Sequence, residues 1–197
     1  MKAIISVSAC CLLILGWGLP AQDTWELITT SGDVPGPRIG HSLVNIGNTL
    51  YLYGGSDSTK GSFSTIHTFN YNQKEWTEED DPATIPPARQ YHRAIVKDSR
   101  MYVFFGSGTN GVLADIWEYD PQTHLWNVIV PAGALQPVAR QQHAAVLSGN
   151  TVYISGGLDA NGNALSDCWA YRFATNSWQR YADIPTGAIY GHTAAFD

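Results

Sequence analysis

The sequence predicts an all-β protein built from tandem repeats, and three observations lead to this prediction. The 197 residues include 19 Gly, 10 Pro, 10 Tyr and 7 Trp, and only 14% are charged, a composition that favours strands and turns over helices. A segment that begins near His41 returns twice along the chain. Short runs of β-prone residues, bounded by turn residues, lie at the same place in each copy.

The repeated segments are RIGHSLVNIGNTLYLYGG (38–55), RQYHRAIVKDSRMYVFFG (89–106) and RQQHAAVLSGNTVYISGG (140–157). Later landmarks keep the same step, because a tryptophan follows each of the first three histidines by 34 or 35 residues and an aromatic residue lies seven positions before that tryptophan. A period near fifty residues indicates stacked, equivalent structural units. The histidines are His41, His92, His143 and His192, the tryptophans are Trp76, Trp126 and Trp178, and the aromatic residues are Phe69, Tyr119 and Tyr171.

Each repeat is predicted to contain four strands, here called A to D. Strand A starts at the histidine, and strand B is a nearly continuous apolar run (50–53, 101–105 and 151–154), as expected of a strand buried on both faces. Residues 115–126 hold strands C and D, joined by a turn over 120–123, where proline sets φ for a type I turn.

These features resemble the kelch repeat, and the resemblance covers nearly all of the chain after its first residues. It depends on the double glycines Gly54-Gly55 and Gly156-Gly157 together with the aromatic and tryptophan positions. The middle repeat has Phe105-Gly106 at the double glycine, and we expect Gly108 to take over the tight turn there. The resemblance implies a β-propeller in which every blade is a four-stranded antiparallel sheet.

The chain is predicted to divide into a signal peptide (1–21) and a propeller fragment (22–197). Lys2, the apolar run over 3–15 and the small residues before Gln22 indicate cleavage after Ala21, with a retained anchor helix as the alternative. We therefore expect a secreted or periplasmic protein without a membrane span in the mature chain.

The repeats span about 38–88, 89–139 and 140–188, and a fourth starts at 189–197. Residues 24–28 match a D strand that has no A to C strands before it, and 191–197 match an A strand that has no B strand after it. The fold expected is an incomplete propeller with about three complete blades and partial blades at both ends, the N-terminal fragment of a longer protein.

Charge and cysteine content exclude several classes of function. The net charge is −6 and no basic cluster is present, which argues against nucleic-acid binding. Cys168 is the one cysteine outside the predicted signal peptide, and we interpret it as a small core residue. No nucleophile elbow, phosphate loop or metal signature occurs, so we expect no catalytic residue, metal or cofactor.

Residues that recur in every repeat are interpreted as structural, because a residue needed in each blade is needed by the blade. This argues against a joint metal or catalytic role for the leading histidines. The structural set is His41, Gly54, Gly55, Trp76, His92, Gly106, Trp126, His143, Gly156, Gly157, Trp178 and His192.

The B–C connections (55–64, 106–114 and 157–166) and the D–A connections (78–90 and 130–141) are long and differ between repeats. Variable loops on a rigid scaffold are the usual place for recognition. Arg38, Arg89 and Arg140 recur at the start of strand A, where pairing with carbonyls or a carboxylate is the alternative to ligand binding. The non-recurring candidates for partner binding are Asp57, Lys60, Thr109, Asn110, Asp159 and Asn161.

Two functions remain open from the sequence. The preferred one is a secreted kelch-repeat scaffold that binds a protein or glycan partner through its long B–C and D–A loops. The alternative is part of a carbohydrate-active propeller enzyme similar to sialate mutarotases or galactose oxidase. Because the sequence contains no catalytic motif, we expect that the protein is not an enzyme.

Overall fold

The structure, a computed structural model, describes residues 2–7, 10–15, 26–79 and 84–195. These residues form twenty strands and no helix, which confirms the all-β prediction. It follows that the described part of the chain contains no helix with the length and apolar character needed to cross a membrane.

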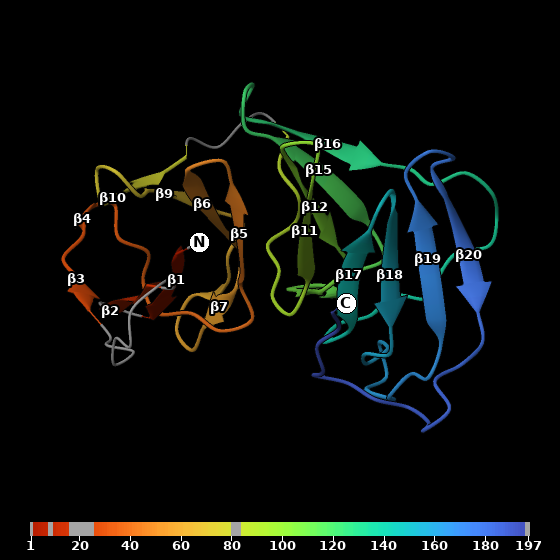
Figure 1. Ribbon diagram of the computed structural model, residues 1–197. Coiled ribbons are helices and arrows are strands. Elements are labelled where there is room, and N and C mark those ends of the chain that lie inside the picture. Colours follow the sequence, from red (N-terminus) through yellow and green to blue (C-terminus); the bar gives the residue numbers. More distant parts are fainter. Residues whose placement is uncertain (1, 8–9, 16–25, 80–83, 196–197) are drawn as a thin grey trace.

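Three sheets follow one another along the chain, each with four antiparallel strands, and the first has an added fifth strand at its outer edge; the groups of four are called blades 1 to 3 (Figure 1). Each has the strand order A–B–C–D, and the A strands of neighbouring blades lie beside one another at the inner edge. This arrangement confirms the prediction of three complete propeller blades. Blade 1 contains β5 (Ser42–Ile46), β6 (Thr49–Tyr53), β9 (Ile66–Asn70) and β10 (Glu75–Glu78), blade 2 contains β11 (Arg93–Lys97), β12 (Arg100–Phe104), β15 (Ile116–Asp120) and β16 (Leu125–Ile129), and blade 3 contains β17 (Ala144–Ser148), β18 (Thr151–Ser155), β19 (Cys168–Arg172) and β20 (Ser177–Tyr181).

The long connections carry short strands of their own. In the B–C connections, β7 (Ser56–Asp57) pairs with β8 (Gly61–Ser62), and β13 (Ser107–Gly108) pairs with β14 (Gly111–Val112). The segment before blade 1 adds β4 (Ser31–Gly32) in parallel to the outer strand β10, and Ala132 forms the same parallel bridge to Ser177 in blade 3. The segment before blade 1 and the connection from blade 2 to blade 3 therefore each run along the outer edge of the sheet that follows.

The two ends of the chain differ in detail from the expectation. Strand β3 (Leu27–Ile28) lies in the predicted D segment 24–28, but it pairs with β2 (Cys10–Leu15), which pairs with β1 (Lys2–Val7). The predicted cleavage site and Trp25 lie outside the described residues. The described residues of the predicted last A strand, 191–195, form no strand, because no B strand lies beside them to supply the ladder of hydrogen bonds.

The three tryptophans of the D strands occupy equivalent surroundings. Each is the cross-strand partner of the aromatic residue in its own strand C. The ring centroids lie 5.0, 5.1 and 5.3 Å apart in blades 1, 2 and 3. The repeat interpretation, which required related environments for these residues, is therefore confirmed. The pairs are Phe69–Trp76, Tyr119–Trp126 and Tyr171–Trp178.

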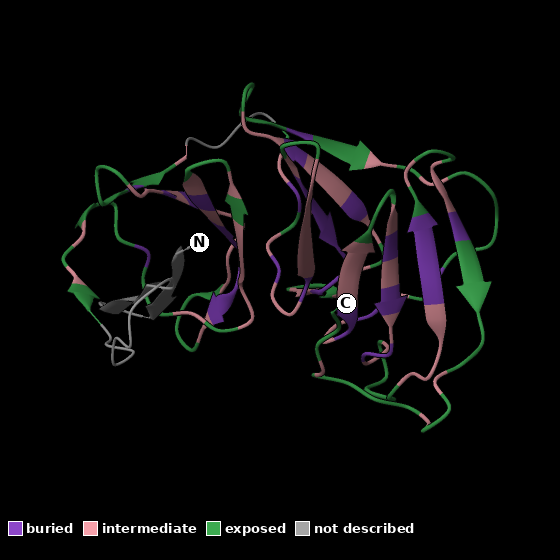
Figure 2. Cartoon of the chain, in the orientation of Figure 1, coloured by how far each residue is buried: buried purple, intermediate pink, exposed green. Residues whose placement is uncertain are grey.

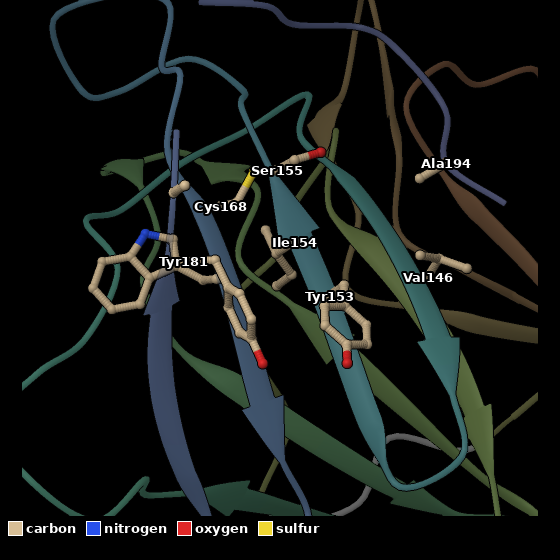
Figure 3. A pocket seen from close by; sticks show the side chains of 9 residues that line it. Val146, Tyr153, Ile154, Ser155, Cys168, Tyr181 and Ala194 are labelled. Carbon is tan, nitrogen blue, oxygen red and sulfur yellow. The ribbon is translucent and has the colours of Figure 1, made fainter. Parts of the chain in front are cut away.

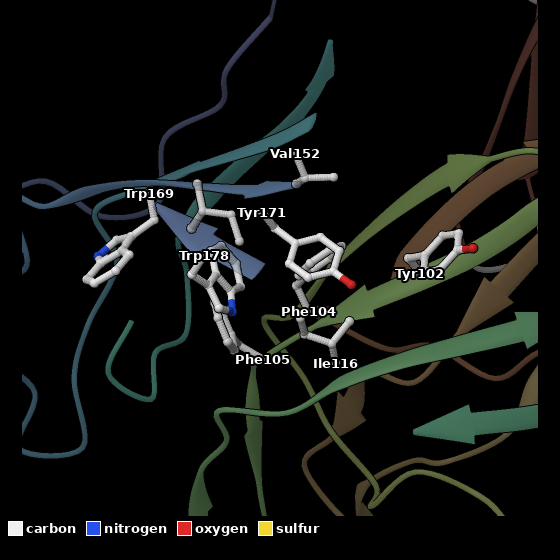
Figure 4. Packing of buried hydrophobic residues seen from close by; sticks show 9 residues of the cluster. Tyr102, Phe104, Phe105, Ile116, Val152, Trp169, Tyr171 and Trp178 are labelled. Carbon is white, nitrogen blue, oxygen red and sulfur yellow. The ribbon is translucent and has the colours of Figure 1, made fainter. Parts of the chain in front are cut away.

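The core lies between the blades and not within one sheet. Successive residues of β12 point to opposite faces, so that Met101 and Val103 pack toward blade 1 while Tyr102 and Phe104 pack toward blade 3. Figure 2 shows the burial concentrated in the middle strands and the outer strands β16 and β20 largely exposed. Figure 4 shows the aromatic cluster between blades 2 and 3, where residues of β12 meet those of β19 and β20.

Two backbone hydrogen bonds join each blade to the start of the next. Gly55 N–H donates to the Arg89 carbonyl (2.9 Å), and Arg89 N–H donates to the Phe63 carbonyl (3.0 Å). The same pair of bonds links Gly106 and Leu113 to Arg140, and Gly157 and Leu165 to Ile189. These contacts place the starts of the A strands of blades 2 and 3, and the segment after blade 3, against the B–C loop of the preceding blade.

Candidate functional site at the axial mouth

A belt of backbone hydrogen bonds runs from blade to blade where the A strands begin. Tyr91 N–H donates to the Gly40 carbonyl (2.7 Å), Gln142 N–H donates to the Tyr91 carbonyl (3.0 Å), and Gly191 N–H donates to the Gln142 carbonyl (2.8 Å). All four residues have positive φ, between 55° and 69°. This belt brings equivalent positions of different blades together at one end of the axis.

At two of the belt positions a residue other than glycine adopts a backbone conformation that favours glycine. Tyr91 and Gln142 both have φ of 55°, in the left-handed region that costs an ordinary residue about 1–2 kcal/mol. Gly40 and Gly191 show that the same backbone forms with glycine. Strained positions of this kind concentrate at functional sites, so the side chains of Tyr91 and Gln142 are candidates for recognition.

Arg93 lies in the same region and links two further repeats. Its Nε donates to the His143 carbonyl (2.7 Å), and one Nη donates to the His192 carbonyl (3.1 Å). The other Nη donates to no protein acceptor, and no carboxylate lies within 4.0 Å of the guanidinium, among the residues the structure describes. The side chain is half-buried, and this burial lowers the pKa of Arg93. We call Tyr91, Arg93 and Gln142 the axial mouth.

The recurring histidines lie directly behind this mouth and have structural contacts. His92 Nε2 lies 2.8 Å from Ser42 Oγ of blade 1, and His192 Nε2 lies 2.9 Å from Ser155 Oγ of blade 3. Burial, with a smaller effect from the charge of Arg89, lowers the pKa of His92 to about 3. Burial likewise holds the pKa of His143 well below its ordinary value. Both rings are therefore neutral at pH 7. His92 hydrogen-bonds through Nε2, whereas the His143 ring packs against Phe105.

The double glycines are explained by close contact with these histidines. A Cβ on Gly55 would lie 2.9 Å from His41 Cβ, and a Cβ on Gly54 would lie 2.6 Å from the Arg89 carbonyl oxygen. In the middle repeat, Phe105 itself adopts φ of 57° and Gly106 keeps φ of 104°. Gly108 has no positive φ and lies in β13, so the expectation that it takes over the turn is wrong.

Arg89 and Arg140, two of the candidate binding residues, are fully buried. Arg89 forms a two-point contact with Asp115, with Nη–Oδ distances of 2.7 and 2.8 Å, and Arg140 does the same with Asp167 at 2.8 and 2.7 Å. Neither guanidinium reaches the surface. They therefore take the carboxylate-paired role that the sequence left as the alternative to ligand binding, whereas Arg38 is half-exposed and has no such carboxylate.

The non-recurring candidates lie on separate B–C loops. Asp57 accepts backbone hydrogen bonds from Thr59 and Lys60, and Thr109 and Asn110 are exposed at the tip of the β13–β14 hairpin. In blade 3, the Asp159 carboxylate accepts hydrogen bonds from the backbone N–H groups of Asn161 and Asn163, both at 2.8 Å. Asp57 and Asp159 thus organise their own loops, and among the described residues no hydrogen bond or ion pair joins the three loops directly to one another.

The axial mouth was missed in the sequence, although a signal for it exists. The residues that flank the repeating histidine differ between repeats: Gly40 and Ser42, Tyr91 and Arg93, Gln142 and Ala144, Gly191 and Thr193. A variable residue beside an architectural one is placed precisely by the scaffold while remaining free to change. Such positions are as informative as the long loops.

A pocket of about 330 Å³ lies on the face of blade 3 that points away from blade 2 (Figure 3). Its lining is mainly apolar and includes Val146, Tyr153 and Cys168. Cys168 takes the place of Ile66 and Ile116, which are buried between blades. The pocket is therefore the blade 3 counterpart of the faces that blades 1 and 2 bury against their neighbours. Burial, together with the charges of Asp167 and Asp183, raises the pKa of the Cys168 thiol.

A metal-binding group is not assembled in the described part of the chain. Within residues 26–79 and 84–195, no three His, Cys, Asp or Glu side chains lie close enough together to hold an ion. The axial mouth thus offers the half-buried cation of Arg93, together with an aromatic and an amide residue at the belt positions Tyr91 and Gln142. Such a set can bind an anionic or polar group.

Comparison with known proteins identifies related sequences and a related structure. The profile of the KLHDC2/KLHL20/DRC7 Kelch-repeats domain matches residues 15–196. Acyl-CoA-binding domain-containing protein 4 of Arabidopsis thaliana is 30% identical over 84% of the chain and 25% of its own length. Kelch domain-containing protein 3 of Rattus norvegicus is 34% identical over 63% of the chain and 33% of its own length.

Kelch domain-containing protein 10 of Bos taurus is 29% identical over 87% of the chain and 40% of its own length. The chain therefore spans between a quarter and two fifths of these curated relatives. The solved structure of YjhT superposes with a TM-score of 0.80 at 18% identity, over 96% of this chain and 65% of that one. This likeness shows the fold alone.

Proposed function

The chain belongs to the kelch-repeat family, and from this premise we propose that it is a recognition module whose axial mouth binds an acidic segment of a protein partner. The observation that supports the proposal is the unpaired positive charge of Arg93. Its guanidinium is held by carbonyls of two different repeats and has no carboxylate partner among the described residues.

The physical argument starts from the cost of a half-buried cation. A guanidinium taken partly out of water is stabilised when a carboxylate completes its hydrogen bonds, usually in a two-point contact. Arg89 and Arg140 obtain that carboxylate within the chain, whereas Arg93 does not. Arginine and tyrosine are also the residues most enriched at the energetic centres of protein interfaces, and Tyr91 lies on the same belt.

The test is selection of peptides from a displayed random library on the immobilised 197-residue chain. We expect enriched peptides to contain Asp or Glu, and their affinity to fall at least about tenfold in Arg93→Gln, the loss of one charged hydrogen-bonded contact. Arg172→Gln, which removes an exposed arginine on β19, is the matched control and should bind as the wild type does. Enrichment without acidic residues, or equal binding by Arg93→Gln, would contradict the proposal.

The carbohydrate-active alternative gives a different result in two measurements. A mutarotase would speed the exchange between the two anomers of sialic acid, which is followed by NMR. An oxidase similar to galactose oxidase would carry copper in stoichiometric amount. Either outcome with the purified protein would contradict the proposed recognition function and favour an enzyme.

We further propose that the protein is exported and that residues 1–21 are removed. The charge at Lys2 and the apolar run over 3–15 support this proposal. N-terminal sequencing of the protein made in its own host should begin at Gln22. An intact N-terminus in a cytosolic fraction would contradict it.

A further inference from the structure

The arginine that starts each repeat is held by the same backbone contacts in all three blades. Its Nε donates to the carbonyl two residues before it, with distances of 3.2, 3.1 and 3.1 Å. Its Nη1 donates to the first residue of the double-glycine position, at 3.1, 2.9 and 3.0 Å. The side chain therefore has one conserved pose, represented by Arg38, Arg89 and Arg140.

Blades 2 and 3 complete this pose with a carboxylate and a tryptophan. The carboxylate bridges both Nη atoms of the arginine and also accepts a hydrogen bond from the indole Nε1 two residues later, at 2.7 Å in blade 2 and 2.6 Å in blade 3. The guanidinium charge is thereby neutralised inside the protein. The groups are Asp115 with Trp117 and Asp167 with Trp169.

Blade 1 keeps the arginine but lacks both partners. The Gly54 N–H donates to the Thr65 carbonyl at 3.2 Å, the bond that Phe105 makes to Asp115, so Thr65 occupies the aspartate position. His67, two residues later, occupies the tryptophan position. The site that holds a carboxylate in two blades holds only a short hydroxyl side chain in the third.

The polar atoms around this position lack partners. Thr65 Oγ1 and His67 Nδ1 are buried and make no hydrogen bond, and Arg38 Nη2 has no acceptor, within the described residues. His67 is only 5% exposed, so its orphan nitrogen is shut off from water. A buried polar atom without a partner loses the hydrogen bonds that water would give it. Two such atoms, next to an Arg38 Nη2 that has no acceptor among the described residues, indicate that a ligand group belongs there.

The surrounding charges leave the Arg38 guanidinium without a direct counter-ion. Burial lowers the pKa of Arg38, although the charges of Glu78 and Asp57 oppose this effect, and no carboxylate of the described residues lies within 4.0 Å of its guanidinium. Glu78 instead approaches His67 Nε2 at 3.4 Å. The Phe63 ring stacks under the guanidinium, 4.5 Å from its centroid, which covers one face of the cation and leaves its edge free.

We propose that Arg38, Thr65 and His67 form a binding site for a carboxylate group supplied by another molecule, at the position that Asp115 and Asp167 fill in blades 2 and 3. Arg38 is half-exposed where Arg89 and Arg140 are fully buried, so a ligand can reach its edge from solvent. The site is independent of the axial mouth, because Arg93 takes no part in it. The failure of one proposal therefore leaves the other standing.

The test uses acetate as the probe and reads the arginine side chains by NMR. Acetate is added to the ¹⁵N-labelled 197-residue chain at constant ionic strength, with chloride as the balancing anion. We expect the Nε–Hε signal of Arg38, assigned with Arg38→Lys, to shift and saturate, while the signals of Arg89 and Arg140 stay in place. A shift that does not saturate, or equal shifts of all three signals, would overturn the proposal.

A second arm supplies the carboxylate from within the chain. Thr65→Asp should abolish the acetate response of Arg38 and raise the unfolding temperature by about 3 °C, the effect of roughly 1 kcal/mol in a chain of this size. Ser64→Asp adds the same charge one residue away and should keep the response. Persistence of the acetate response in Thr65→Asp would also overturn the proposal, and the wild-type titration decides the matter if that variant does not fold.

Discussion

Phe105 and Trp178 stack face to face across the boundary between blades 2 and 3, with ring centroids 5.8 Å apart and planes inclined by 18°. Phe105 occupies a position that is glycine in the other two repeats, and it holds a positive φ there. The contact with Trp178 shows what the side chain gains in return for the backbone strain.

Replacing Phe105 by glycine should destabilise the protein by about 3 kcal/mol. Loss of a buried phenylalanine costs about 3–5 kcal/mol, and relief of the left-handed conformation returns about 1 kcal/mol. Urea unfolding followed by tryptophan fluorescence measures the difference. If Phe105→Gly were as stable as the wild type, the stack with Trp178 would contribute nothing to the blade interface.

Gly156→Ala should be much more damaging than Gly149→Ala. Both glycines have positive φ, of 59° and 54°, but a Cβ on Gly156 would lie 2.3 Å from the Ile189 carbonyl oxygen, whereas a Cβ on Gly149 would meet open space. We expect about 1 kcal/mol for Gly149→Ala, the backbone term alone. Comparing the unfolding temperatures of the two variants isolates the cost of the contact between the new Cβ and the Ile189 carbonyl. Equal losses of stability would show that the backbone moves apart there at no cost.

Asp167→Ala should cost about 3 kcal/mol, because it leaves the fully buried Arg140 without its counter-ion. The control is Asp183→Ala, which breaks the exposed Arg180–Asp183 pair and should cost less than about 1 kcal/mol. Denaturant unfolding compares the two. Similar small losses in both variants would mean that Arg140 finds another acceptor.

Stability should fall as the pH drops from about 6.5 toward 3. Burial lowers the pKa of His92 to about 3 and holds that of His143 well below its ordinary 6.5, so the folded protein excludes protons that the unfolded chain takes up. Each such histidine reduces the free energy of unfolding by up to about 1.4 kcal/mol per pH unit in this range.

Urea midpoints measured at pH 7, 6 and 5 test this expectation, above the range in which Asp115 and Asp167 titrate. Burial favours a higher pKa for both carboxyls, but the hydrogen bonds and charge of their arginines outweigh it and hold each pKa below its ordinary 3.8. Their contribution is therefore lost only below that pH. The slope of the free energy of unfolding against pH gives the number of protons that the chain takes up when it unfolds. In His92→Gln this number should be smaller by about one. A free energy of unfolding that stays constant between pH 7 and 5 in the wild type would contradict the interpretation.

The repeated architecture could be predicted from the sequence because a propeller places the same residue in the same surroundings in every blade. The spacing from His41 to Trp76 is set by the path of the chain through four strands, and it returns in each repeat. What the spacing does not reveal is which recurring residue is paired. The sequence does not distinguish Arg38 from Arg89 and Arg140. The structure does, because Arg89 pairs with Asp115 and Arg140 with Asp167.

The departures from the repeat were harder to interpret than the repeat itself. The pattern Asp-x-Trp at 115–117 and 167–169 becomes Thr-x-His at 65–67, which is visible in the sequence once the role of the aspartate is known. Phe105 illustrates the opposite case. Its ring is accommodated by Trp178 of the next blade, a contact between residues 73 positions apart that no local pattern predicts.

The belt through Gly40, Tyr91, Gln142 and Gly191 is made of main-chain atoms only, so it accepts at Tyr91 and Gln142 any residue that keeps its N–H and adopts the positive φ. A library that varies Tyr91 and Gln142, with proline and β-branched residues left out, should therefore keep the three blades in place while changing the side chains at the axial mouth. Under the binding role that we propose for the axial mouth, new affinities could then be introduced at these two positions without redesigning the blades.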